Sequence, residues 1–134
     1  MNTIVFACVH GAGRSQMATA WFNHFADPAK ARALAAGSEP ASKVHDVVVT
    51  AMGEVGMDVS SARPRLLDDA LVADAACVIT MGCGERCPVT PPHVRRFDWP
   101  FDDPKSGSIE EVRRIREAIA ARVRAFVTDE GWLR

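Results

Sequence analysis

The stretch IVFACVHGAGRS, residues 4–15, decides the fold of this chain. Its first four residues are apolar and predict a strand, while the segment Gln16 to Phe22 has apolar residues at helical spacing. The residues between them form a glycine-containing loop from the carboxyl end of a strand to the amino end of a helix. Backbone N–H groups and the helix dipole can converge on one anion at such a position.

The residue types in this loop suit the binding of a tetrahedral oxyanion. Gly11 and Gly13 let the backbone fold back with its amides inward, and the Arg14 guanidinium supplies a permanently charged planar fork. Cys8 then lies beneath the anion as nucleophile, and the same dipoles and Arg14 favour its thiolate form. The expected anion-binding residues are Val9, His10, Gly11, Ala12, Gly13 and Arg14.

Two plainer interpretations of this loop compete with an oxyanion site. It can be an ordinary strand–helix connection, or one half of a nucleotide site. The nucleotide motifs G-x-G-x-x-G and G-x-x-x-x-G-K-[ST] are both absent around residues 8–15. The order strand, cysteine, glycines, arginine, serine and helix favours the oxyanion loop.

Composition limits the class of protein and its partners. At 134 residues we expect one domain, residues 1–134. The net charge of −1, without a polybasic run, gives no reason to expect nucleic acid or a membrane as partner. Neither a signal peptide nor a membrane-spanning helix is expected, and the four cysteines do not resemble a secreted disulfide framework. The sequence therefore predicts a cytoplasmic protein with reduced thiols.

The alternation of apolar segments predicts an α/β domain. The expected strands cover residues 4–7, 31–36, 75–81 and 94–98, and the expected helices cover 15–25, 44–55, 65–71 and a segment from Ser108 to about Val127. Right-handed crossovers then give a single three-layer domain with a central four-stranded parallel sheet flanked by helices. We expect the arginines of the last helix, at 113, 114, 116, 122 and 124, to form a solvated face. His45 is expected to be a surface residue without a function.

Ligands of open parallel sheets bind beyond the carboxyl ends of the strands. The loops after Ala7, Met81 and Asp98 should meet at that edge. This would gather Cys8, the segment with Cys83 and Cys87, and the pair Asp102 and Asp103 in one place.

These motifs together resemble a known family. Cys-x5-Arg-Ser near the amino terminus and a late Asp-Pro dipeptide are similar to the low-molecular-weight protein tyrosine phosphatase superfamily, and within it to the arsenate reductases that use the phosphatase-type loop. Further matching segments are 13–18, 36–37, 78–81, 83–88 and 98–104. The resemblance implies that Asp103 is the general acid and that the Ser15 hydroxyl hydrogen-bonds the Cys8 thiolate. The alternatives are a simple turn at Asp102 and Asp103, and a helix cap at Ser15.

The remaining cysteines bear on the choice between phosphatase and reductase. Reducing arsenate needs two electrons from thiols, and Cys83 and Cys87 supply a dithiol in a segment rich in glycine and proline. We expect Cys83 to attack the arsenylated Cys8 first, and Cys87 to resolve the resulting disulfide. In one alternative, a small-molecule thiol attacks from outside and one of these cysteines is only structural. In another, Cys83, Cys87 and His93 bind zinc, with or without Cys77. Irregular spacing disfavours the zinc site, Cys77 is expected in the core, and we expect no metal and no cofactor.

The chain contains no tyrosine, so an aromatic slot for phosphotyrosine is not expected. We therefore predict arsenate as substrate, with phosphate and sulfate as mimics, and thioredoxin or a low-molecular-weight thiol with a glutaredoxin-type system as electron donor. The alternatives are a phosphatase acting on small phosphate esters and a non-catalytic module that binds oxyanions or arsenite. Many relatives have asparagine where this chain has Gly11, so we expect a softer loop here.

Overall fold

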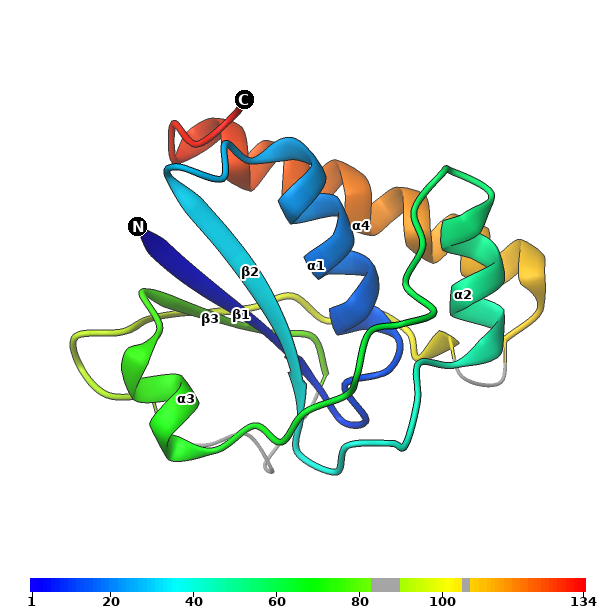
Figure 1. The fold of residues 1–134 in the computed structure, drawn as a ribbon, viewed down its shortest axis with the longest axis horizontal. Coiled ribbons are helices and arrows are strands. Elements are labelled where there is room, and N and C mark those ends of the chain that lie inside the picture. Colours follow the sequence, from blue (N-terminus) through cyan, green and yellow to red (C-terminus); the bar gives the residue numbers. More distant parts are fainter. Residues whose placement is uncertain (83–89, 105–106) are drawn as a thin grey trace.

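The core of the fold is a parallel sheet with the strand order β2-β1-β3-β4. We describe it from a computed structural model, for residues 1–82, 90–104 and 107–134 (Figure 1). The strands are β1 (Asn2–Cys8), β2 (Ala31–Gly37), β3 (Cys77–Thr80) and β4 (Arg95–Asp98). All three neighbouring pairs are parallel, in the registers Cys8 to Gly37, Ala7 to Thr80 and Thr80 to Asp98.

Helices cover both faces of this sheet. They are α1 (Arg14–Phe25), α2 (Asp46–Gly53), α3 (Asp69–Asp74) and α4 (Ile109–Asp129). Figure 1 shows α3 on one side of the sheet and α1, α2 and α4 on the other. Side chains alternate along β1, so that Ile4 and Phe6 join one hydrophobic core and Val5 and Ala7 join the other. The predicted fold class, a three-layer α/β domain with a four-stranded parallel sheet, is confirmed.

The strand predicted at 31–36 is present although alanine is a poor strand former. β2 is ARALAAG in sequence and pairs with β1 along its whole length. Burial between β1 and the helices therefore outweighs the weak strand propensity of alanine.

The helix predicted at 65–71 is wrong for residues 65–68. Leu67 N–H donates to Gly37 O at 2.9 Å, and Leu66 forms an isolated parallel bridge with Gly37, so this part of the chain is extended. Helix α3 begins later, because the Asp68 carboxylate accepts from Leu71 N–H at 2.8 Å and caps it.

Helix α4 begins as predicted, with the Ser108 hydroxyl accepting from Glu111 N–H at 3.2 Å. The prediction of a solvated arginine face is wrong for Arg116, which is only 9% exposed. Among the residues that the structure describes, no helix has both the length and the apolar character needed to cross a membrane.

Candidate anion-binding active site

The loop between β1 and α1, residues 8–14, is called the anion loop below, and its carbonyl groups point outward. The carbonyl oxygens of Cys8, Val9, His10 and Ala12 accept from the backbone N–H groups of Ser38, Glu39, Ala41 and His45, at 3.2, 2.7, 3.0 and 3.0 Å. The donors belong to residues 38–45, which we call the brace segment. The Gln16 side chain donates from Nε2 to Gly11 O at 2.9 Å and completes the series.

Outward carbonyls leave the amides of the anion loop for a ligand. Among the described residues, the backbone N–H groups of residues 10–13 donate no hydrogen bond. They lie directly before the amino end of α1, where the helix dipole is positive. This arrangement is a preorganised cradle for an anion.

Two glycines allow the anion loop to take this shape. Gly11 has φ of +59°, a left-handed backbone that glycine adopts without a Cβ clash. A Cβ atom added to Gly37 would lie 2.4 Å from Gly11 N, so the end of β2 needs a glycine for the loop to approach. Sequence reasoning gave Gly37 no role of its own. It also missed Gln16, whose side chain braces the loop through its contact with Gly11 O.

Cys8 lies at the base of the cradle and is 2% exposed. Its Sγ is 3.0 Å from the Ser15 hydroxyl oxygen, and Ser15 is fully buried. Helix α1 has its N-cap at Gly13 and no side-chain cap in the described part of the chain, so Ser15 does not act as the capping residue. Its hydroxyl is placed instead to donate to a thiolate at Cys8.

Arg14 is buried beside Cys8 with its guanidinium oriented by the loop after β4. The side chain donates from Nη1 to Phe101 O at 3.0 Å, and Nη2 is 3.9 Å from Oδ2 of Asp103. Its Nε is buried and has no hydrogen-bond partner among the described residues. Gly82 packs directly against this guanidinium, since an added Cβ would lie 2.4 Å from Arg14 Nη1. Gly82 was also missed, although its place at the end of an apolar run was a signal.

Asp103 lies at the mouth of the cradle, and its side chain is 43% exposed. The following residue, Pro104, packs on the anion loop: a Cβ on Gly13 would lie 3.0 Å from Pro104 Cγ and 3.3 Å from His45 Cδ2. An open cavity of about 550 Å³ lies beside Asp103, between the loop at 100–103 and α4. The structure therefore brings Arg14 and Asp103 together, and Cys8 contacts Ser15, the residue that follows Arg14. The structure also shows that His45, expected to be surface without a function, is part of the loop's support.

Of the other three cysteines, Cys83 and Cys87 lie outside the described residues. Cys77 is 1% exposed in β3, and burial raises the pKa of its thiol to about 12. It is therefore a core residue, as expected. The zinc alternative needs Cys83 and Cys87 as ligands, so the described residues do not test it. The third candidate ligand, His93, has its Nε2 atom 3.1 Å from Ala73 O.

Comparisons with known proteins agree with this geometry. The model of the low molecular weight phosphotyrosine protein phosphatase family matches residues 3–130. Arsenate reductase 1 of Bacillus cereus is 37% identical over 128 residues, covering 93% of each chain. A solved arsenate reductase from Archaeoglobus fulgidus has a TM-score of 0.78 and 30% identity, over 93% of this chain and 98% of that one. A thioredoxin-dependent arsenate reductase from Corynebacterium glutamicum has a TM-score of 0.82 and 36% identity, over 96% of this chain and 61% of that longer one. This chain therefore belongs to the low molecular weight phosphotyrosine protein phosphatase family.

Proposed function

We propose that this protein reduces arsenate to arsenite. The observation that carries the proposal is the anion loop, whose outward carbonyls and inward amides surround a buried cysteine beside an arginine fork. Arsenate is a small tetrahedral oxyanion that such a loop can bind through its amides and Arg14. The arsenate reductases among the relatives favour this substrate.

The first chemical step is attack of the Cys8 thiolate on arsenic. An As–S bond forms, one As–O bond breaks, and Asp103 protonates the departing oxygen so that water leaves. The Ser15 hydroxyl, 3.0 Å from Cys8 Sγ, stabilises the thiolate before the attack. The distance of 3.9 Å between Asp103 and the Arg14 guanidinium supports the role of Asp103 as acid, because an oxyanion bound to Arg14 would present its oxygens near the Asp103 carboxyl group.

The second step is reduction by the remaining thiols. The Cys83 thiolate attacks Cys8 Sγ and forms a disulfide, while the electron pair of the As–S bond returns to arsenic and arsenite leaves. Cys87 then attacks Cys83, which frees Cys8 and leaves a Cys83–Cys87 disulfide. A dithiol partner of the thioredoxin type, or a low-molecular-weight thiol with a glutaredoxin-type protein, reduces this disulfide. Because the relay must be reduced before every turnover, we also propose the reducing cytoplasm as its compartment.

The second candidate function is a phosphatase that acts on small phosphate esters. The matching family model and the shared cysteine, arginine and aspartate chemistry support it. Phosphotyrosine itself is disfavoured because the chain has no tyrosine to line an aryl slot. Arsenate is preferred because the dithiol of Cys83 and Cys87 has a use in reduction and none in hydrolysis.

The deciding experiment measures arsenate-dependent NADPH oxidation with thioredoxin and thioredoxin reductase, alongside hydrolysis of an aryl phosphate. The variants are Cys8→Ser, Cys83→Ser and Cys87→Ser, with Cys77→Ser as the matched control. We expect the first three to lose arsenate reduction and the control to keep it. Hydrolysis of the aryl phosphate without arsenate reduction would support the phosphatase instead. Full activity of both relay variants with a small thiol would show that the thiol attacks from outside. Tight binding of arsenite with neither activity would identify a binding module.

A further inference from the structure

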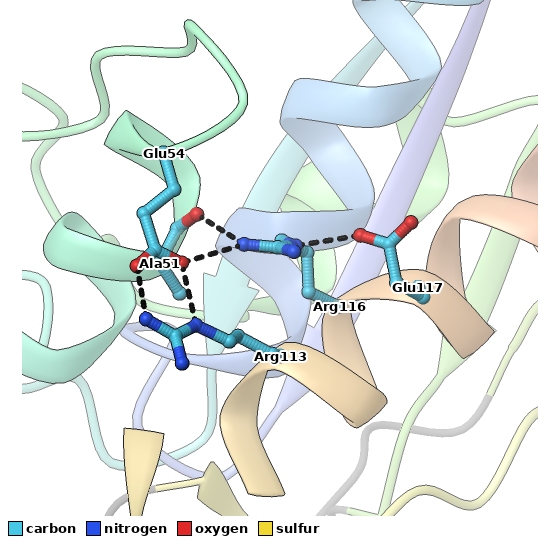
Figure 2. Close-up of polar contacts among 5 residues, drawn as sticks. All are labelled: Ala51, Glu54, Arg113, Arg116 and Glu117. Carbon is cyan, nitrogen blue, oxygen red and sulfur yellow. Dashed lines mark hydrogen bonds and ion pairs between the residues drawn. The ribbon is translucent and has the colours of Figure 1, made fainter. Parts of the chain in front are cut away.

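A charged cluster ties the carboxyl end of α2 to α4 (Figure 2). Arg116 of α4 donates from Nη1 to Ala51 O at 2.8 Å and to Glu54 Oε1 at 3.0 Å. Arg113 donates from Nε to the same carboxylate oxygen at 2.9 Å, and from Nη2 to Glu54 Oε2. The Arg116 Nε also donates to Glu117 at 2.6 Å. We call Glu54, Arg113 and Arg116 the α2 clamp.

The contacts of the clamp fix the carboxyl end of α2. Ala51 lies in the last turn of α2, where carbonyl groups lack partners within the helix, and Arg116 satisfies one of them. Glu54 directly follows the helix and is held by both arginines. These bonds hold the Glu54 carboxylate in its charged form, so its pKa falls to about 2. The end of α2 is therefore bound to α4 by charge-assisted bonds, the strong class of hydrogen bonds in proteins.

The opposite end of α2 supports the anion loop. The helix begins at Asp46, and its N-cap residue His45 donates from its backbone N–H to Ala12 O at 3.0 Å. The His45 ring also lies against Gly13, where an added Cβ would approach it to 3.3 Å. His45 is the last residue of the brace segment. A shift of α2 along α4 would therefore move a direct partner of the anion loop.

We propose that the α2 clamp positions the anion loop through α2 and the brace segment. The clamp does not touch the substrate, so its members are positioning residues. The rigid element between clamp and loop is the eight-residue helix α2. When the clamp is intact, the Ala12 and Gly13 amides are held in place for the oxyanion before it binds. This inference rests on the proposed function in one respect, because it assumes that the anion loop binds an oxyanion.

Inorganic phosphate is the probe for the test, because it mimics arsenate without being reduced. Calorimetric titration would give its Kd for wild type, Glu54→Gln and Arg116→Gln. The matched control is Glu130→Gln, which breaks the pair of Arg95 and Glu130 at the far end of α4 without touching α2. Thermal unfolding of all four proteins separates a loss of stability from a loss of positioning.

We expect the phosphate Kd of Glu54→Gln and Arg116→Gln to rise roughly 3- to 10-fold, the usual size of coupling between linked sites. The KM for arsenate should rise in parallel, with little change in kcat. Glu130→Gln should keep the wild-type Kd and KM, although its Tm should fall about as much as that of the clamp variants. Arg116→Lys, which keeps the charge but reaches fewer acceptors, should give an intermediate Kd. If Arg116→Gln does not fold, Glu54→Gln carries the test.

A phosphate Kd of Glu54→Gln within twofold of that of Glu130→Gln would overturn the proposal. Wild type that binds phosphate but does not reduce arsenate would count against the proposed function and leave the role of the clamp intact. Wild type that does not bind phosphate would overturn the anion cradle, and with it this inference.

Discussion

Gly82→Ala should disable anion binding by displacing Arg14 rather than by unfolding the protein. The new Cβ would lie 2.4 Å from Arg14 Nη1, a distance that no real Cβ contact reaches. The nearest atom is the tip of a long side chain, so the guanidinium will move and little else need move with it. Its bond to Phe101 O, at 3.0 Å, will be lost in the process.

The expected rise in the Kd for phosphate follows from the interactions of Arg14. A hydrogen bond to a charged group contributes about 1.5–3 kcal/mol, so losing one should raise the Kd for phosphate about 10- to 100-fold. Alanine at a positive φ adds a stability cost of roughly 1–2 kcal/mol. Gly82 has φ of +105°, and Gly56, with φ of +81°, has no atom of the described residues within 4 Å of an added Cβ. Gly56→Ala is therefore a control that carries a similar backbone cost without the contact.

The assay is titration with phosphate, followed by the KM for arsenate, for both alanine variants and wild type. Gly82→Ala should bind phosphate weakly, and Gly56→Ala should bind like wild type with a similar loss of Tm. If Gly82→Ala and Gly56→Ala bind phosphate equally well, Arg14 does not depend on Gly82 and the reasoning is refuted.

Three further predictions follow from contacts of single residues. Ser15→Ala removes the hydroxyl that lies 3.0 Å from Cys8 Sγ, and steady-state kinetics should show kcat about 10- to 100-fold lower with phosphate affinity kept; an unchanged kcat would contradict the role of Ser15. The pKa of Glu54 is lowered from 4.5 to about 2 by its bonds to Arg113 and Arg116, so its contribution to stability is complete above about pH 4.5 and is lost as the pH falls toward 2. Urea unfolding at about pH 6 and pH 3 should therefore show a larger acid-induced loss for wild type than for Glu54→Gln, and equal losses would refute the assignment. Burial raises the pKa of the Cys77 thiol to about 12, so mass spectrometry should find Cys77 unmodified after alkylation of the folded protein near pH 8, and its rapid modification would contradict the buried placement.

Much of the fold could be predicted because local patterns and burial agree along most of the chain. The apolar run at residues 4–7 and the helical spacing after Ser15 both match the observed elements. The start of the helix predicted at 65–71 was wrong because Leu66 and Leu67 continue as extended backbone against Gly37, a contact between distant residues that periodicity does not report. The prediction of a solvated Arg116 was wrong for a different reason. Arg116 lies four residues after Val112 and three before Ile119, so it falls on the buried stripe of α4, and the sequence signal was present.

The residues of the candidate site also fall into those that the sequence indicates and those that only the folded chain reveals. Cys8, Arg14 and Asp103 stand out in the sequence by their chemistry and spacing, and the structure places Arg14 near Asp103, while their catalytic roles stay predictions. Gly37 and Gln16 could not be predicted, because each acts through contact with a backbone group whose position only the folded chain defines. Gly82 had a signal, its place at the end of an apolar run, but its contact with the Arg14 guanidinium is visible only in the folded chain. The roles of Cys83 and Cys87 stay predictions.

The outward carbonyls of the anion loop have a consequence for amide hydrogen exchange. The brace-segment amides that hold these carbonyls, those of residues 38, 39, 41 and 45, are bonded in the folded protein and should exchange slowly. The amides of residues 10–13 have no protein acceptor among the described residues, so they should exchange quickly until an oxyanion occupies the loop. Two short segments that share one set of hydrogen bonds should therefore differ sharply in exchange rate. Only the amides of residues 10–13 should slow down when the ligand binds. Their exchange rates therefore report occupancy of the loop, amide by amide, without any turnover.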